Sequence, residues 1–462
     1  MTKPKNKNIE MITGDPKKAI IKLALPMMLS MLLIMLYNIA DSIWVAGLGA
    51  DALAAVGFIT PLFMVLVGLG NGIGAGANSL IARYIGAKNY SQANNAGLHG
   101  IVLSVIVSVI FTVIIEVFMV PILQFMGAGD TIQYAMDYSY IIFGFLFVFV
   151  YSGVASAIFR SEGDMRRATI AIAVTAIFNI ILDPIFIYVL NLGIAGAAWA
   201  TVFSAILSCV VMSYWIWGKK DLYLDLSWKN FDYSGKLMID ILQVAIPSTL
   251  ETIVFSALAI IINSMLVMAS GTTAVAVYTA SMRIVQLAMI PLIGLGTAVL
   301  TVSGVAYGAR NIENLKTSHS YSIKVGFAIS ILLGAIMFIF SSQIATMFSY
   351  TEASSVLAPE IATAISVLSL FVLAFPHGMM SSMMFQGVGK GVYSLLITLL
   401  RSLILESVFA YIFCFIFGWG LPGIYGGVVF GCFVGGTVGY IWAKLFINRL
   451  EHKFNKKVTT EE

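Results

Sequence analysis

Long apolar runs, separated by short polar breaks, follow one another along almost the whole 462-residue chain. A helix needs about 20 apolar residues to cross the hydrocarbon core of a bilayer, and every run reaches that length. Only 10% of the residues are charged, whereas about a quarter are charged in soluble globular proteins. We therefore predict an all-α integral membrane protein with twelve transmembrane helices. The predicted spans are 18–47, 52–83, 93–118, 131–158, 167–190, 194–217, 237–268, 272–307, 317–342, 355–386, 392–417 and 421–446.

Among the loops between the predicted spans, lysine and arginine occur only in alternate ones. They occur at the N-terminus, near 83–92, 160–167 and 308–317, in the segment 218–236, at Lys390 and in the C-terminal tail. The loops between these contain no basic residue. By the positive-inside rule, both termini and the segment 218–236 are predicted to be cytoplasmic, in a multi-pass protein of the cell membrane.

The two halves of the chain are related by an internal repeat. Lys88-Asn89 recurs as Arg310-Asn311 and Gly49 recurs as Gly271, all at an offset of 222 residues. Because each half holds an even number of spans, the halves run in the same direction and are expected to frame a central cleft. The predicted organisation is an N-terminal lobe (1–217), a cytoplasmic linker (218–236), and a C-terminal lobe with a short tail (237–462).

Two aspartates are predicted at similar depth in the outer half of the N-terminal lobe. A charge at the bilayer centre costs about 2.5–3.5 kcal/mol on insertion scales, so Asp41 and Asp183 need a reason to be there. Asn179 precedes Asp183 by one helical turn, and Thr201 returns to the same depth on the next span. Two carboxylates in a dry pocket do not ionise together easily, so this cluster can take a proton or Na⁺.

The site is expected in one lobe only. The repeat equivalent of Asp41 is Asn263, and that of Asp183 falls at Phe409 or Ala410. Neither position is acidic, so the two halves are predicted to differ in function although they share a fold.

Other membrane residues are candidates for ligand binding or movement. Tyr37 and Asn38, on the helix of Asp41, together with Met64 and Glu251, are predicted to bind substrate; Glu251 could equally serve as a second coupling group or join helices by hydrogen bonds. Pro26 removes one backbone hydrogen bond from the first span and predicts a hinge there. The remaining ionisable residues, for which pairing between helices or packing is favoured, are Arg401, Glu406 and His377.

With these features in place, the chain resembles the multidrug and toxic compound extrusion (MATE) family over essentially its whole length. The motifs that carry the resemblance are LP at 25–26, NIAD at 38–41, GADALAAVG at 49–57, GAGA at 74–77, GA at 86–87, FRSEGD at 159–164, NIILDP at 179–184 and GIAGAA at 193–198.

It looks most like the DinF-type branch, including its archaeal members. That resemblance implies a coupling cation held by Asp41, Asn179, Asp183 and Thr201, with Tyr138 nearby, and the same four residues as Na⁺ ligands if sodium is the ion. It also implies a first helix that bends at Pro26. The NorM-type branch uses acids in spans seven and ten, and here span ten has only Glu360, near its outer end.

The predicted function is a secondary antiporter, because buried acids in only one half of a repeated membrane protein suit the binding of a coupling ion. It would export organic cations and amphipathic drugs in exchange for H⁺ or Na⁺ by alternating access, as a monomer, without a cofactor or nucleic acid. The alternative is a flippase for a lipid-linked precursor of the same superfamily, for which Arg283 would be the one clear phosphate-binding candidate. A membrane enzyme is disfavoured because no catalytic or metal-spaced motif is present.

Overall fold

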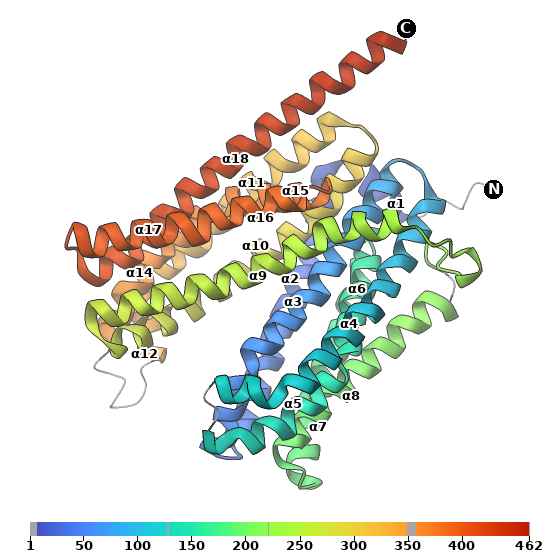
Figure 1. The fold of residues 1–462 in the computed structure, drawn as a ribbon. Helices are drawn as coiled ribbons and strands as arrows, with labels where there is room; N and C mark the ends of the chain where they lie inside the picture. The colour runs from blue at the N-terminus through green and yellow to red at the C-terminus, as the bar shows by residue number, and fades with distance from the viewer. Residues whose placement is uncertain (1–6, 127–128, 220, 349–356, 462) are drawn as a thin grey trace. The chain divides into compact units, whose positions relative to one another are not determined.

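Helices make up nearly all of the computed structural model, which describes residues 7–126, 129–219, 221–348 and 357–461 (Figure 1). Within these residues, ten helices are long and apolar enough to cross a membrane. Two further pairs, each bent at a short break, bring the number to twelve when each pair is one span. The all-α, twelve-span prediction is therefore confirmed, although the predicted start of the span 355–386 lies outside the described residues.

The first compact unit comprises Met1–Gly14 and Leu25–Thr249. Its helices are α1 (Lys7–Thr13), α3 (Ala50–Gly86), α4 (Tyr90–Phe125), α5 (Ile132–Gly144), α6 (Leu146–Ser161), α7 (Met165–Pro184) and α8 (Gly193–Ser213). Short 3₁₀ or π-helical segments complete it: η1 (Gly129–Thr131), η2 (Ile185–Val189), η3 (Tyr214–Gly218) and η4 (Trp228–Asn230).

The second compact unit comprises Asp15–Ala24 and Leu250–Glu462. Its helices are α10 (Thr272–Gly308), α11 (Ile312–Ile339), α12 (Ser341–Phe348), α14 (Ala358–Ala374), α15 (Pro376–Gly387), α16 (Gly391–Thr398), α17 (Glu406–Tyr411) and α18 (Gly420–Glu461). Two π-helical segments, η5 (Leu399–Leu405) and η6 (Ile412–Ile416), interrupt the span that α16 begins.

Two long helices are each divided between the units. Helix α2 (Pro16–Ala46) changes unit between Ala24 and Leu25, directly before Pro26. Helix α9 (Gly235–Ser270) changes unit between Thr249 and Leu250, two residues after Pro247. Because proline removes a backbone hydrogen bond, both helices change unit where their backbone is least constrained.

The turns reproduce the internal repeat in their backbone geometry. Lys88 and Arg310 both adopt the left-handed conformation, with φ of 56° and 54°, which non-glycine residues seldom do. The next residue in each half is an asparagine that caps the following helix: the side chain of Asn89 accepts from the Gln92 amide, and that of Asn311 from the Asn314 amide.

Glycines on α3 hold the first half of α9 within the first unit. Gly68, Gly72 and Gly76 are spaced by four residues and so share one face of the helix. The Thr249 hydroxyl donates to the Gly68 carbonyl over 3.2 Å, and a Cβ atom at Gly76 would collide with the Ile241 carbonyl oxygen. The two backbones approach this closely because α3 has no side chains along that face.

Candidate functional site

Asn179 and Asp183 lie one turn apart on α7 and are almost fully buried, at 1% and 0% exposure. The Asn179 amide nitrogen donates to Asp183 Oδ1 over 3.3 Å and to the Thr201 hydroxyl over 3.2 Å. The Thr201 hydroxyl in turn donates to the Ala197 carbonyl on its own helix, α8. The structure thus brings together three of the predicted residues from two neighbouring helices.

The turn between α7 and α8 sets this geometry. Helix α7 ends at Pro184 and continues as the π-helical turn η2, after which Asn191 and Gly193 adopt positive φ values and reverse the chain. Gly196 on α8 then packs directly against the backbone of Phe186, where a side chain would collide. This close approach returns α8 alongside α7 and places Thr201 next to Asn179.

Asp41 of α2 and Tyr138 of α5 complete the cluster. Asp41 and Asp183 are close enough for their charges to interact, and Tyr138 lies within the electrostatic range of both. Tyr138 is buried, with 9% of its surface exposed, while Asp41 is half-buried. Tyr37, one turn before Asp41, also lies within electrostatic range of it.

Three oxygen atoms of this cluster are buried without a hydrogen-bond partner among the described residues. They are Asp41 Oδ1, Asn179 Oδ1 and Asp183 Oδ2. Buried polar atoms normally have a partner, so three free oxygens in one cluster indicate room for a ligand that accepts their lone pairs. Carboxylate and amide oxygens are the donors that hard cations prefer, and a carboxylate can also take a proton.

The other predicted substrate residues, Asn38, Met64 and Glu251, do not belong to this buried cluster. Met64 has half of its surface exposed and Asn38 is also exposed, so neither is packed into the buried cluster. Glu251 lies in the second unit, 9% exposed, and accepts a 2.6 Å hydrogen bond from Ser394 and two longer ones from Gln386. Glu251 therefore makes hydrogen bonds between helices, one of the three roles that the sequence left open.

The repeat correspondence at the cluster follows from the backbone. The π-helical turns η2 and η6 match at an offset of 227 residues, and so do the contacts of Gly196 with Phe186 and of Gly423 with Phe413. At this offset Asp183 corresponds to Ala410. The second unit therefore has no carboxylate at that position.

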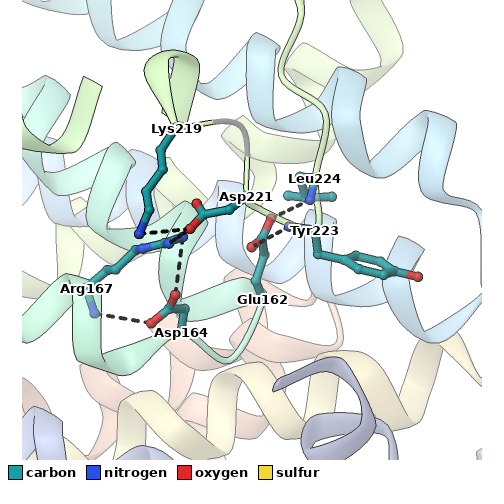
Figure 2. A network of polar contacts seen from close by, with 7 residues as sticks. All are labelled: Glu162, Asp164, Arg167, Lys219, Asp221, Tyr223 and Leu224. Carbon is teal, nitrogen blue, oxygen red and sulfur yellow. Dashed lines mark hydrogen bonds and ion pairs between the residues drawn. The ribbon is translucent and has the colours of Figure 1, made fainter. Parts of the chain in front are cut away.

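Sequence reasoning missed how the segment after η3 binds the first unit (Figure 2). Glu162, in the turn between α6 and α7, accepts hydrogen bonds from the backbone amides of Tyr223 and Leu224 over 3.2 and 2.6 Å. Arg167 pairs with Asp221 at 2.6 Å. The acid and the arginine stand close together in the sequence, but nothing in the sequence indicates that their partners lie some 60 residues later.

Helix α4 holds the rest of this segment. The Asn95 side chain donates to the Asp232 carbonyl over 2.7 Å and accepts from the Asp232 amide over 3.3 Å. The Ser234 amide donates to His99 Nε2 over 2.9 Å. The segment that joins the two halves is thus held, within the first unit, by the turn between α6 and α7, by α7 and by α4.

The described residues contain no group of three or more His, Cys, Asp or Glu side chains that could hold a metal ion. The aspartate cluster has only two acidic members, and its remaining donors are an amide and hydroxyl groups.

Comparison with known proteins identifies the family. The sequence model described as MatE matches residues 26–185 and 247–412, more than half of the chain. The chain belongs to the MATE family. Members of this family are transporters, so the protein is a membrane transporter and not an enzyme.

Individual relatives agree with this assignment. The chain is 29% identical to a probable multidrug resistance protein, YoeA of Bacillus subtilis, over 65% of its length and 66% of the relative's, just under two thirds. It is 30% identical to the multidrug export protein MepA of Staphylococcus haemolyticus, over 67% of each chain. A solved outward-facing multidrug resistance MATE family transporter is 39% identical, with a TM-score of 0.93 over 97% of this chain and 99% of that one.

Proposed function

We propose that this MATE transporter is a secondary antiporter that exports organic cations and amphipathic drugs in exchange for H⁺ or Na⁺. The observation that carries the proposal is the set of three unpartnered oxygens on Asp41, Asn179 and Asp183. Multidrug export by relatives such as MepA supports the substrate class. The proposal places the coupling ion among these oxygens, with Thr201 and Tyr138 beside them.

Charge neutralisation is the proposed driving step. When Asp41 and Asp183 are both ionised they repel each other, which favours an open, hydrated site that attracts a cationic drug. When a proton or Na⁺ neutralises the pair, the repulsion falls and the surrounding groups close around it. A ligand shifts such an equilibrium only by its different affinity for the two states, so ion and drug must weaken each other's binding equally.

Helix α7 offers a physical route from this site to the hinge in α2. At its far end, the Thr169 hydroxyl donates to the Pro26 carbonyl over 3.0 Å, and the Ser30 hydroxyl donates to the same carbonyl over 2.9 Å. Asp183 lies fourteen residues further along α7, about 21 Å at 1.5 Å per residue. A shift of α7 on ion binding would therefore pull on the carbonyl of the proline where α2 changes unit.

The finer features of the proposal rest on the sequence. These are a DinF-type archaeal relationship, a cell-membrane location with cytoplasmic termini, a monomeric state, a division into lobes 1–217 and 237–462, and a drug site that includes Tyr37, Asn38 and Met64. The flippase alternative is less well supported, because Arg283 is exposed and the named relatives are multidrug transporters.

The test is efflux of a fluorescent organic cation from proteoliposomes under separate pH and Na⁺ gradients. Asp41→Asn and Asp183→Asn should each abolish gradient-driven export while the protein stays folded, and Glu313→Gln, at an exposed acid in the first turn of α11, should transport normally. Drug affinity should fall as either H⁺ or Na⁺ rises. Full export by Asp41→Asn, or an affinity that is flat in both titrations, would contradict the proposal.

A further inference from the structure

Glu406 and Arg401 lie on one face of a membrane-spanning segment although they are five residues apart. Five residues separate side chains on a regular α-helix, but the intervening segment η5 is π-helical. The Glu406 amide donates to the Arg401 carbonyl, which is the i to i+5 hydrogen bond of a π-turn. The extra residue therefore stacks the two side chains one turn apart, and such turns are frequent at functional sites.

The packing of α18 shows the same shift in register. Glycines at four-residue intervals on α18 each lie against the backbone or side chain of one residue of the neighbouring span. The pairs are Gly427 with Ala410, Gly431 with Glu406, Gly435 with Arg401, and Gly439 with Ile397. The contacting glycines on α18 are thus four residues apart, whereas the residues that they contact on the neighbouring span are four, five and four residues apart. The single five-residue step places both Glu406 and Arg401 against the glycine face of α18.

Both side chains are buried and incompletely satisfied. Glu406 is 1% exposed, and neither of its carboxylate oxygens forms a hydrogen bond within the described residues, although Ser402 and Cys432 are its polar neighbours. Arg401 is 3% exposed; its Nε donates to Ser402 over 3.3 Å, while its Nη1 has no partner. The guanidinium lies 4.6 Å from the centre of the Phe375 ring, a cation–π contact.

These two residues approach each other without forming an ion pair. Glu406 lies within electrostatic range of Arg401, yet no nitrogen–oxygen pair between them is within 4.0 Å in the described structure. A buried carboxylate without an ion-pair partner is costly as an anion, whereas its protonated form is neutral. The observed geometry, with Arg401 on an aromatic ring and only the neutral Ser402 hydroxyl and Cys432 thiol beside Glu406, fits a neutral Glu406.

The repeat relates this position to the N-terminal cluster. At the 227-residue offset fixed by η2 and η6, Glu406 corresponds to Asn179. The second unit therefore carries an ionisable acid where the first unit carries the amide that joins Asp183 to Thr201. The acid has moved by one turn, from the position of Asp183 to that of Asn179.

We propose that Glu406 and Arg401 form a proton-binding site in the C-terminal half, separate from the aspartates of the first unit. With the proton bound, Glu406 is neutral and Arg401 rests on Phe375. When the proton leaves, the anionic carboxylate attracts the free Nη1 of Arg401 and the two form an ion pair. The permanent positive charge of Arg401 disfavours a metal cation here, so the ligand is H⁺ alone.

The groups around Glu406 are compatible with this assignment. Segment η5 contributes Arg401, α18 contributes Cys432, and Tyr278 of α10 lies within electrostatic range. Segment η6 contributes no charged side chain. Among the described residues that pack around Glu406, Arg401 is thus the one charged group that faces it. Arg401 also lies within electrostatic range of Glu251.

Infrared difference spectroscopy of the full-length protein in lipid, recorded across roughly pH 5 to 9, tests this site without any transport assay. Glu162 also takes up a proton in this range, so spectra of variants are subtracted from the wild-type spectrum. The component of the protonated-carboxyl carbonyl stretch that is lost in Glu406→Gln should appear as the pH falls and should persist in the double variant Asp41→Asn/Asp183→Asn. The matched control Glu313→Gln should keep it. Because no drug or gradient is used, failure here leaves the antiport proposal standing, and failure of antiport leaves this one standing.

Two further variants cover the case in which Glu406→Gln does not fold. Glu406→Asp retains an acid and should keep the band at a displaced frequency; an undisplaced band would refute the assignment. Arg401→Gln should keep the band at alkaline pH where the wild-type protein loses it, because the anion no longer has a neutralising partner. If the spectra of Glu406→Gln differ from those of the wild-type protein only by a missing band of ionised carboxylate, at every pH, then Glu406 is a permanent anion and the proposal is wrong.

Discussion

Replacement of Glu162 by alanine should release the segment around Tyr223 and Leu224 from the first unit. Glu162 is 2% exposed and accepts hydrogen bonds from both backbone amides (Figure 2). Alanine leaves these two donors without an acceptor, and a buried unsatisfied donor costs about 1–3 kcal/mol. Part of this cost is recovered when the freed amides reach water, so we expect a net loss of about 3 kcal/mol.

Such a loss corresponds to roughly a hundredfold change in the equilibrium for local opening. Hydrogen–deuterium exchange at the amides of Tyr223 and Leu224 should accelerate by about that factor in Glu162→Ala. The control Glu313→Ala removes an exposed acid of the same charge and should leave these amides unchanged. Unaltered protection at Leu224 in Glu162→Ala would refute the reasoning.

The same contact should depend on pH. Burial raises the pKa of Glu162 from 4.5 to about 7, although the amides of Leu224 and Tyr223 oppose the shift. Below about pH 4.5 the carboxyl is protonated in both the bound and the released segment, and above about pH 7 it is ionised in both. Between these values only the released form is ionised, so binding weakens as the pH rises through this window.

The change amounts to roughly 3 kcal/mol, from a pKa difference of about 2.5 at 1.36 kcal/mol each. Protection factors at Leu224, corrected for intrinsic exchange, should therefore fall as the pH increases from about 4.5 to about 7. Glu162→Gln is neutral and retains one acceptor. Its protection factors should lie between those of the wild-type protein and those of Glu162→Ala, and they should not vary with pH. Protection that increases with pH in the wild-type protein would contradict this interpretation.

Two shorter predictions concern the helices that change unit. Gly76→Ala should lower the stability of the first unit by about 1–3 kcal/mol, measured by thermal unfolding, because its Cβ collides with the Ile241 carbonyl oxygen; Gly57→Ala, whose Cβ faces open space, should not. Pro26→Ala should preserve drug binding but slow turnover in proteoliposomes, and an unchanged transport rate would leave Pro26 as a packing residue.

Hydropathy and the repeat were sufficient to predict the helical architecture. An apolar run long enough to cross a bilayer must form a helix because its backbone groups have no water to bond with. The pairs Gly49 with Gly271 and Gly163 with Gly389 all adopt positive φ, as turns at equivalent positions require. Asn179 and Asp183 could be placed together because four residues make one helical turn.

The contacts of Glu251 and Glu162 could not be predicted in the same way. Glu251 bonds to side chains more than 130 residues later, and Glu162 to the backbone of a segment about 60 residues later. Periodicity fixes which face of a helix a side chain occupies, but not which distant helix or loop packs on that face. Backbone amides as partners leave no trace in the sequence, because every residue except proline has one.

The π-helical segment η5 shows why the spacing of Arg401 and Glu406 does not by itself place their side chains. Their five-residue separation indicates divergent side chains only if the helix is regular, and hydropathy does not reveal an inserted residue because both neighbours remain apolar. The glycines on α18 do record it, since their four-residue spacing differs from the spacing of the residues they contact. A comparison of the small-residue periods of two adjacent spans could therefore detect a π-turn from sequence where hydropathy does not.

The two halves show how a duplicated membrane bundle can separate its functions. Close glycine contacts and π-turns are retained at η2 and η6, because a side chain at Gly196 or Gly423 would collide with neighbouring backbone. Side chains beside these turns are free to change, since they do not determine the packing. Asp183 is thus replaced by Ala410 in the second half, while the position of Asn179 has gained an acid. The backbone of the repeat fixes where a buried acid can stand, and the side chains determine which half uses which position.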